Sequence, residues 1–222
     1  MKLDFSCVWK YWPFIVQGGL LTLKLTAICT FLGFLLGVLL SLIKLSKIKP
    51  LVWLAKFYTS VFRGTPLLVQ LCIIHFGFPQ LFGVRFTAVQ SGILTFSLNS
   101  AAYVSEIFRG GIKAIDIGQF EAAKALGVKY RDMMKDIIIP QAFKHILPSL
   151  VNEGISLLKE SSQLSYIGAV ELLRAADQIT VLSFRFFEPY LFIALIYYVF
   201  VMALSFLASK LEKRISRSDR VS

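Results

Sequence analysis

Long apolar runs alternate with short polar and basic segments along the 222-residue chain. A helix needs roughly 20 mostly apolar residues to cross a bilayer, and five stretches have that character. They cover approximately residues 14–43, 53–79, 86–108, 137–165 and 189–209. This pattern predicts an all-α integral membrane protein with five transmembrane helices, built as a single domain over residues 1–222.

The five runs differ in how regular a helix they predict. The first contains four glycines that would allow close helix contact, namely Gly18, Gly19, Gly33 and Gly37. The second carries Lys56 and Arg63, and Pro66 should kink or restart its helix because proline lacks the N–H that a helix interior uses. In the fourth, Pro140 and Pro148 predict interruptions.

Basic residues gather after the first, third and fifth runs. They are Lys44, Lys47 and Lys49, then Lys113, Lys124, Lys129, Arg131 and Lys135, then Lys210, Lys213, Arg214, Arg217 and Arg220. Cytoplasmic loops of membrane proteins carry an excess of Lys and Arg. The amino terminus is therefore expected outside, and both the carboxyl terminus and the segment 111–135 are expected in the cytoplasm.

Composition agrees with a membrane protein. Hydrophobic residues make up 56% of the chain, and the mean hydropathy is +0.69. A net charge of +11 could indicate nucleic-acid binding, but with these apolar runs it fits basic cytoplasmic loops, so no nucleic-acid partner is expected. Cys7, Cys29 and Cys72 have no disulfide or metal-ligand spacing with either histidine, and we expect no metal site. The first apolar run is too long for a signal peptide.

The cytoplasmic segment should form two short helices. Good helix formers fill residues 121–126, and Gly127 can end that helix in a left-handed conformation. Phe120, Ala123 and Leu126 share one helix face, and an apolar face on a cytoplasmic loop needs a cover. A partner protein could supply it, or the helix could lie on the membrane surface.

Ionisable residues inside a span are costly and often functional. Glu153 and Glu160 are seven residues apart, on one helix face and about 10 Å from each other, with Lys159 beside them. This set could hold a zwitterionic ligand, or it could be a self-neutralising network that joins helices. In the third run, Glu106 and Arg109 are spaced as a structural ion pair.

One motif in the cytoplasmic segment is specific. Glu121-Ala122-Ala123, three residues, Gly127, nine residues, and Ile137-x-Ile139-Pro140 resemble the EAA loop of the membrane subunits of bacterial ATP-binding-cassette (ABC) importers. Ile139 stands where the family has Leu. RGTPLLVQL at 63–71, NSAAYVSEIFRGGI at 99–112 and NEGISLLKESSQLSYIG at 152–168 are similar to permease subunits of polar amino-acid importers of the histidine, glutamine and arginine type.

The resemblance implies the type I ABC importer permease fold with a coupling loop at about 111–135. In such importers the EAA helix docks in a groove of the ATPase subunit. By position this implies an ATPase-coupling role for Glu121, Ala122, Ala123, Gly127 and Pro140.

The resemblance also implies a substrate site in the third and fourth spans. It assigns that role to Asn99, Glu153, Lys159 and Glu160. Related chains often have Asp where Glu160 stands, and an apolar residue where Gln163 stands.

The chain has no G-x-x-x-x-G-K-[ST] phosphate loop, so ATP and Mg²⁺ should bind a partner, and the chain is expected to be neither an enzyme nor a holder of a cofactor. The resemblance implies an inner (cytoplasmic) membrane location and several partners. These are an ABC ATPase dimer, a second permease subunit (the same chain or a sister), a periplasmic or lipid-anchored amino-acid-binding protein, and membrane lipid.

Two other functions fit the membrane composition. An ion-coupled secondary transporter or channel could use Glu153, Lys159 and Glu160 as its ion site. A membrane-embedded enzyme lacks support, because no Ser-His-Asp set, metal cluster or phosphate loop is evident in the sequence.

Overall fold

The computed structural model describes residues 3–217, with side chains for residues 3–210, and over that part of the chain it is helical without strands. Lys213, Arg214, Arg217 and Arg220 of the predicted basic tail lie outside the described side chains. Two helices are long and apolar enough to cross a membrane, Trp12–Leu45 (α2) and Phe187–Lys210 within α11 (Phe187–Arg217). They confirm the first and fifth predicted spans.

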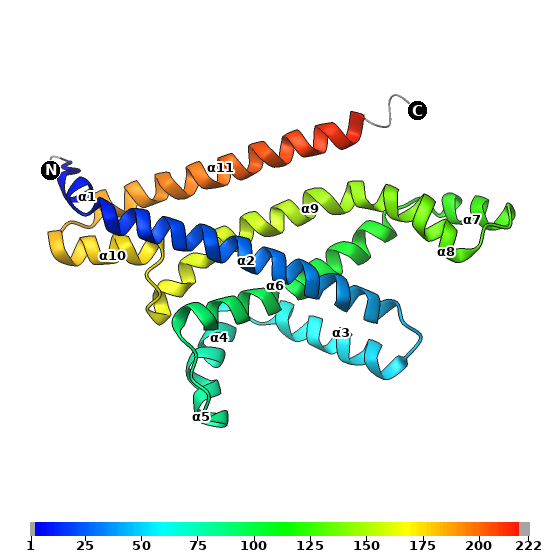
Figure 1. Ribbon diagram of the computed structural model, residues 1–222, viewed down its shortest axis with the longest axis horizontal. Coiled ribbons are helices and arrows are strands. Elements are labelled where there is room, and N and C mark those ends of the chain that lie inside the picture. The colour runs from blue at the N-terminus through cyan, green and yellow to red at the C-terminus, as the bar shows by residue number, and fades with distance from the viewer. Residues whose placement is uncertain (1–2, 218–222) are drawn as a thin grey trace.

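The second predicted span is broken. Helix α3 (Lys49–Gly64) is followed, after Thr65 and Pro66, by α4 (Leu67–Cys72), the π-helix η1 (Ile73–Gly77) and α5 (Phe78–Phe82). The two parts bend by 107°, as the proline predicted. Figure 1 shows α4 to α5 projecting sideways from the bundle. Counted as one bent span, this segment makes three apolar candidates in the described chain.

The third and fourth predicted spans are helices with more polar residues. Helix α6 (Ala88–Lys113) covers the third. The fourth begins in the π-helix η2 (Met133–Ile138), continues as α9 (Ile139–Glu160) and ends in the 3₁₀ helix η3 (Ser161–Ile167). Pro140 is the second residue of α9, directly after the π-helix η2, so the helix changes type near this proline but does not end. The predicted interruption at Pro148 is wrong, because α9 runs through it.

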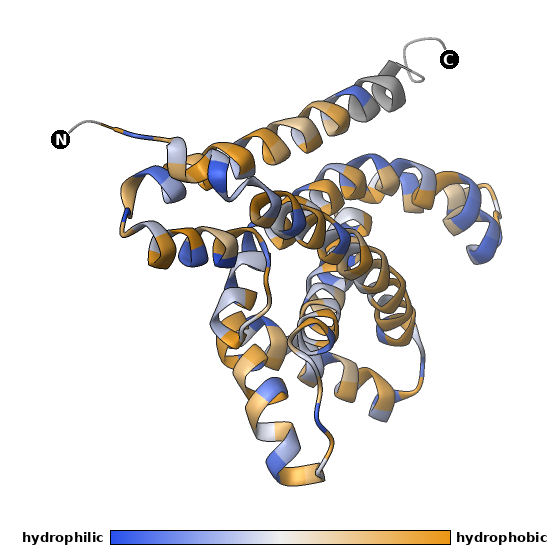
Figure 2. Cartoon of the chain, turned by 60° about the vertical axis from the view of Figure 1, so that its left-hand side comes forward, coloured by the Kyte–Doolittle hydropathy of each residue, from blue (hydrophilic) through white to orange (hydrophobic). Residues whose placement is uncertain are grey.

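Figure 1 shows α2, α6, α9 and α11 running lengthwise, with two pairs of short helices at opposite ends. Helices α1 (Ser6–Lys10) and α10 (Leu172–Ser183) lie at the end with the amino terminus, and α7 (Ile117–Ala125) and α8 (Tyr130–Asp132) lie at the other. In Figure 2 the long helices are mostly hydrophobic, and the end with α7 and α8 is mostly hydrophilic.

Small residues let α2 and α6 pack closely. A Cβ on Gly33 would lie 2.6 Å from the Cβ of Ser100, and one on Gly37 would lie 2.5 Å from the Cβ of Val104. Such separations are closer than real carbon contacts, so only glycine fits at these two positions. This confirms the predicted close contact of the first span and sets the positions of Ser100 and its neighbours on α6.

Candidate functional site

The segment 111–135 forms a compact block at the hydrophilic end. Asp116 caps α7 by accepting a 2.7 Å hydrogen bond from the Gly118 N–H. The helix ends where Gly127 adopts a φ of +71° and the Val128 N–H donates to the Ala123 carbonyl at 3.0 Å. This left-handed ending confirms the role predicted for Gly127.

The block has its own apolar core. Ala123 is only 3% exposed and packs in a cluster with Met133, Ile138 and Ala142. Phe120 packs against the same cluster, whereas Leu126 is 82% exposed. The prediction that Phe120, Ala123 and Leu126 form one face needing an outside cover is therefore wrong in part, because the chain itself covers the first two.

The remaining motif residues face solvent. Glu121, Ala122, Gly127 and Pro140 are exposed, so a docking protein could reach them. Of the five residues assigned to coupling, Ala123 is the one whose side chain is buried in the core of the block.

The block is joined to two long helices. The cluster around Ala123 includes Ile146 of α9, and a Cβ added to Gly111 of α6 would lie 2.3 Å from Ile146. Gln141 of α9 also donates a 3.3 Å hydrogen bond to Gln119 of α7. A force on α7 would therefore reach both α6 and α9.

Of the four predicted substrate residues, one lines the cavity described next. A cavity of about 590 Å³ lies between α2, α6, α9 and α11, and Glu153 is the only one of the four on its lining. Ser100 and Thr30 line it too, and the buried Thr30 hydroxyl has no hydrogen-bond partner in the described chain. Glu160 is partly buried and Lys159 is exposed in the last turn of α9.

Asn99 faces the break between α3 and α4. Its Nδ2 donates to the Phe62 carbonyl and to Oε1 of Gln70, both at 3.0 Å. Gln70 in turn donates from Nε2 to Phe62, Thr65 and the Thr65 hydroxyl. Both N–H bonds of the Asn99 amide are thus used, which leaves its carbonyl oxygen to accept from a ligand.

Sequence reasoning missed Gln70. It is a buried amide in an apolar run, and that alone could have marked it as a partner for another polar group in the bundle. Periodicity could not have paired it with Asn99, which is 29 residues away.

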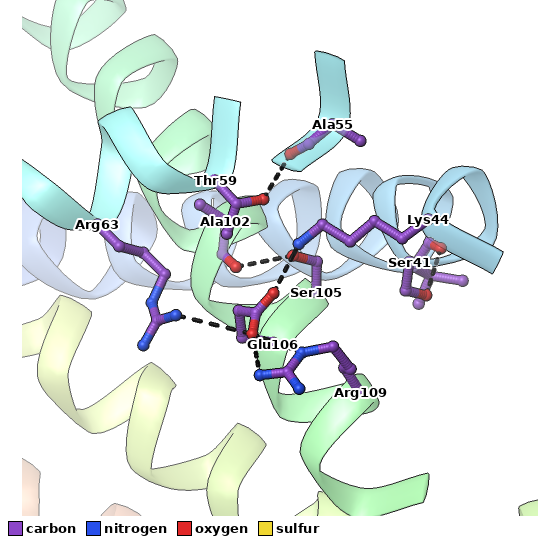
Figure 3. A network of polar contacts seen from close by, with 10 residues as sticks. Ser41, Lys44, Ala55, Thr59, Arg63, Ala102, Ser105, Glu106 and Arg109 are labelled. Carbon is purple, nitrogen blue, oxygen red and sulfur yellow. Dashed lines mark hydrogen bonds and ion pairs between the residues drawn. The ribbon is translucent and has the colours of Figure 1, made fainter. Parts of the chain in front are cut away.

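Figure 3 shows a charged cluster in the carboxyl-terminal part of α6. Glu106 accepts from Lys44 of α2 at 2.8 Å and from Arg109 Nε at 2.7 Å, which confirms the predicted Glu106–Arg109 pair. Arg63 of α3 lies 3.8 Å from the same carboxylate. The cluster therefore joins three helices.

Comparisons with known proteins agree on one family. The sequence pattern described as "Binding-protein-dependent transport system inner membrane component" matches residues 31–217. The arginine transport system permease protein ArtQ of Bacillus subtilis is 48% identical over 219 residues, which cover 99% of this chain and all of ArtQ. A putative glutamine transport system permease protein GlnP of Rickettsia bellii is 50% identical over 214 residues, covering 95% of this chain and 98% of the relative.

Solved structures give the same result. A crystal structure described as an amino acid ABC transporter with histidines has a chain that is 47% identical, with a TM-score of 0.92 over 96% of this chain and 100% of that one. A chain of the inward-facing MetNI methionine ABC transporter is 18% identical with a TM-score of 0.74, covering 97% of this chain and 99% of that one. The second likeness concerns the fold alone.

Proposed function

Because this chain belongs to the family of binding-protein-dependent transport system inner membrane components, we propose that it is the permease subunit of an ABC importer for a polar amino acid. The proteins that it resembles over nearly its whole length carry names of arginine and glutamine permeases. We also propose that the chain crosses the membrane five times, with the amino terminus outside and the carboxyl terminus in the cytoplasm. This orientation rests on the distribution of basic residues.

The block at 111–135, called the coupling block, is the part of the chain that the ATPase subunit would move. Its exposed Glu121, Ala122 and Gly127 form the docking face for a separate ATPase subunit, and its core ties that face to α6 and α9. ATP-driven closure of an ATPase pair would pull or push α7 and so move both helices. ATP binding then favours one orientation of the pathway by differential binding, and hydrolysis resets it.

The proposed substrate-binding residues lie on α6 and α9. Glu153 in its cavity, Glu160, and the free carbonyl oxygen of Asn99 are acceptors, so they suit the ammonium and polar side chain of an amino acid. A second carboxylate near two acidic groups would be repelled, which favours a cationic or neutral side chain. Lys159 would act as a counter-charge at the end of α9.

The remaining partners follow from the family. A second permease subunit would complete the pathway, and an external amino-acid-binding protein would deliver the substrate. Lipid surrounds the exposed apolar faces of α2 and α11.

Site-directed cross-linking tests the coupling face. An Ala122→Cys variant, co-expressed with its ATPase subunit, is expected to cross-link to that subunit. Phe184→Cys is the control, because Phe184 is 88% exposed but directly follows α10, which lies at the opposite end of the bundle from α7. Cross-linking at Phe184 and not at Ala122 would contradict the proposed orientation and docking face.

A further inference from the structure

One carboxylate faces three cations in the charged cluster of Figure 3. Lys44 and Glu106 are the buried pair, with side chains 8% and 17% exposed. Arg109 pairs with Glu106 within α6. Lys44 and Arg109 together bring two positive charges to the single negative charge of Glu106. The cluster therefore carries an excess of positive charge, and Arg63 contributes to it.

Arg63 is the least committed of the three cations. Its ion-pair distance to Glu106 is 3.8 Å, and its side chain is 44% exposed. The guanidinium lies over the Tyr103 ring, 5.3 Å from the centroid, which holds its plane in place. Among the described residues these contacts leave most of its five N–H donors for another acceptor.

The position of Arg63 connects it to the proposed substrate site. It lies at the α3 break, next to Phe62, whose carbonyl accepts from both Asn99 and Gln70. On α6, the spacing of Asn99, Tyr103 and Glu106 by four and three residues puts them on one helix face. A polar track thus runs from Asn99 past Arg63 towards the coupling block.

Arg63 lies far from the start of α3 and against α6. It follows Lys49, the first residue of α3, by 14 residues, or about 21 Å along the helix axis, and it contacts Tyr103 and Glu106 of α6. An anion that meets Arg63 therefore does so beside this polar track.

We propose that Arg63, oriented by Tyr103, binds the α-carboxylate of the transported amino acid as it moves towards the cytoplasm. A guanidinium can hold a carboxylate through two parallel hydrogen bonds, whereas the neighbouring acceptors suit the ammonium end. Glu106 competes for the same guanidinium, so the carboxylate is released again. This inference rests on the proposed function, since it needs an amino acid to pass through the chain.

Uptake of a free amino acid and of its α-amide tests the carboxylate contact. The complete transporter, with its ATPase and receptor, is reconstituted in proteoliposomes. The receptor would itself distinguish the two compounds. Initial uptake rates are therefore measured with the receptor saturated by each compound, and the preference for the free acid is the ratio of these two rates. Arginine and argininamide, and glutamine and its α-amide, are the probes. Wild type should prefer the free acid, and Arg63→Gln should reduce that preference about tenfold.

Two further variants test whether the effect comes from the charge of Arg63, from its paired hydrogen bonds, or from general damage to the charged cluster. Arg63→Lys keeps the charge but loses the paired hydrogen bonds, so it should retain only part of the preference. Arg109→Gln is the matched control, because Arg109 is similarly exposed and also pairs with Glu106, and it should retain the full preference. If Arg63→Gln does not assemble, the Arg63→Lys and Arg109→Gln pair decides the question.

Each other outcome has one meaning. An unchanged preference in an assembled Arg63→Gln transporter, or in Arg63→Lys, overturns the inference. A defect in Arg63→Gln that appears only in vesicles containing anionic lipid assigns Arg63 to lipid phosphate and also overturns it. Absence of ATP-driven uptake of any amino acid by wild type overturns the proposed function, and the inference with it.

Discussion

At the scale of single residues, the same residue type serves different purposes according to its surroundings. Glu106 is bound by cations from three helices and holds the bundle together. Glu153 lines a mostly apolar cavity, and Glu160 is partly buried at the end of α9. Carboxylates in spans are costly without partners, so the last two are better suited to a ligand.

Glu160 provides the residue-scale test of the substrate site. Replacing it with Ala or Gln removes its charge, and the KM for amino-acid uptake should rise about tenfold, equivalent to about 1.4 kcal/mol. The kcat for the ATPase step and assembly with the ATPase should change little. Unchanged uptake kinetics in both variants would remove Glu160 from the site.

Residue identity alone indicated the candidates for the proposed substrate site. The sequence marked Glu153, Glu160 and Asn99 because polar groups are rare in spans. It could not show that Asn99 uses both of its N–H bonds on Phe62 and Gln70, since that contact joins helices whose relative placement depends on the 107° bend. Nor could it show that Ala123 points into the block's own core.

At the scale of elements, helix ends and helix contacts were the most predictable features. Glycine at 127 and proline at 66 impose local backbone constraints, and both acted where predicted. Pro148 did not, because a helix held by neighbours on several sides can tolerate a proline. The π-helices η1 and η2 were not predicted from the sequence.

The ending of α7 gives the element-scale prediction. Gly127→Ala places a side chain at a φ of +71°, which costs about 1–2 kcal/mol and should disturb the docking face. Gly110→Ala is the control, because a Cβ there also meets open space but the backbone is helical. Co-purification of the ATPase should fall for Gly127→Ala and stay at the wild-type level for Gly110→Ala. Equal co-purification would show that the left-handed ending is unimportant for docking.

At the scale of the whole molecule, the arrangement explains how a motor could act on a pathway. The hydrophilic coupling block lies at one end of the bundle (Figure 2). The α6 and α9 helices that leave it carry the proposed substrate residues, and Gly111 lies in close contact with Ile146 between them. Movement of the block would therefore be transmitted to the proposed substrate site through two packed helices, without a long flexible linker.

The most direct measurement is amino-acid uptake into proteoliposomes that contain the permease, its ATPase and its receptor. We expect a cationic or neutral polar amino acid to accumulate in the vesicles. This accumulation should require ATP and the receptor, and it should stop when the ATPase subunit is omitted. Uptake driven by an ion gradient without any ATPase would contradict this expectation and would favour an ion-coupled transporter.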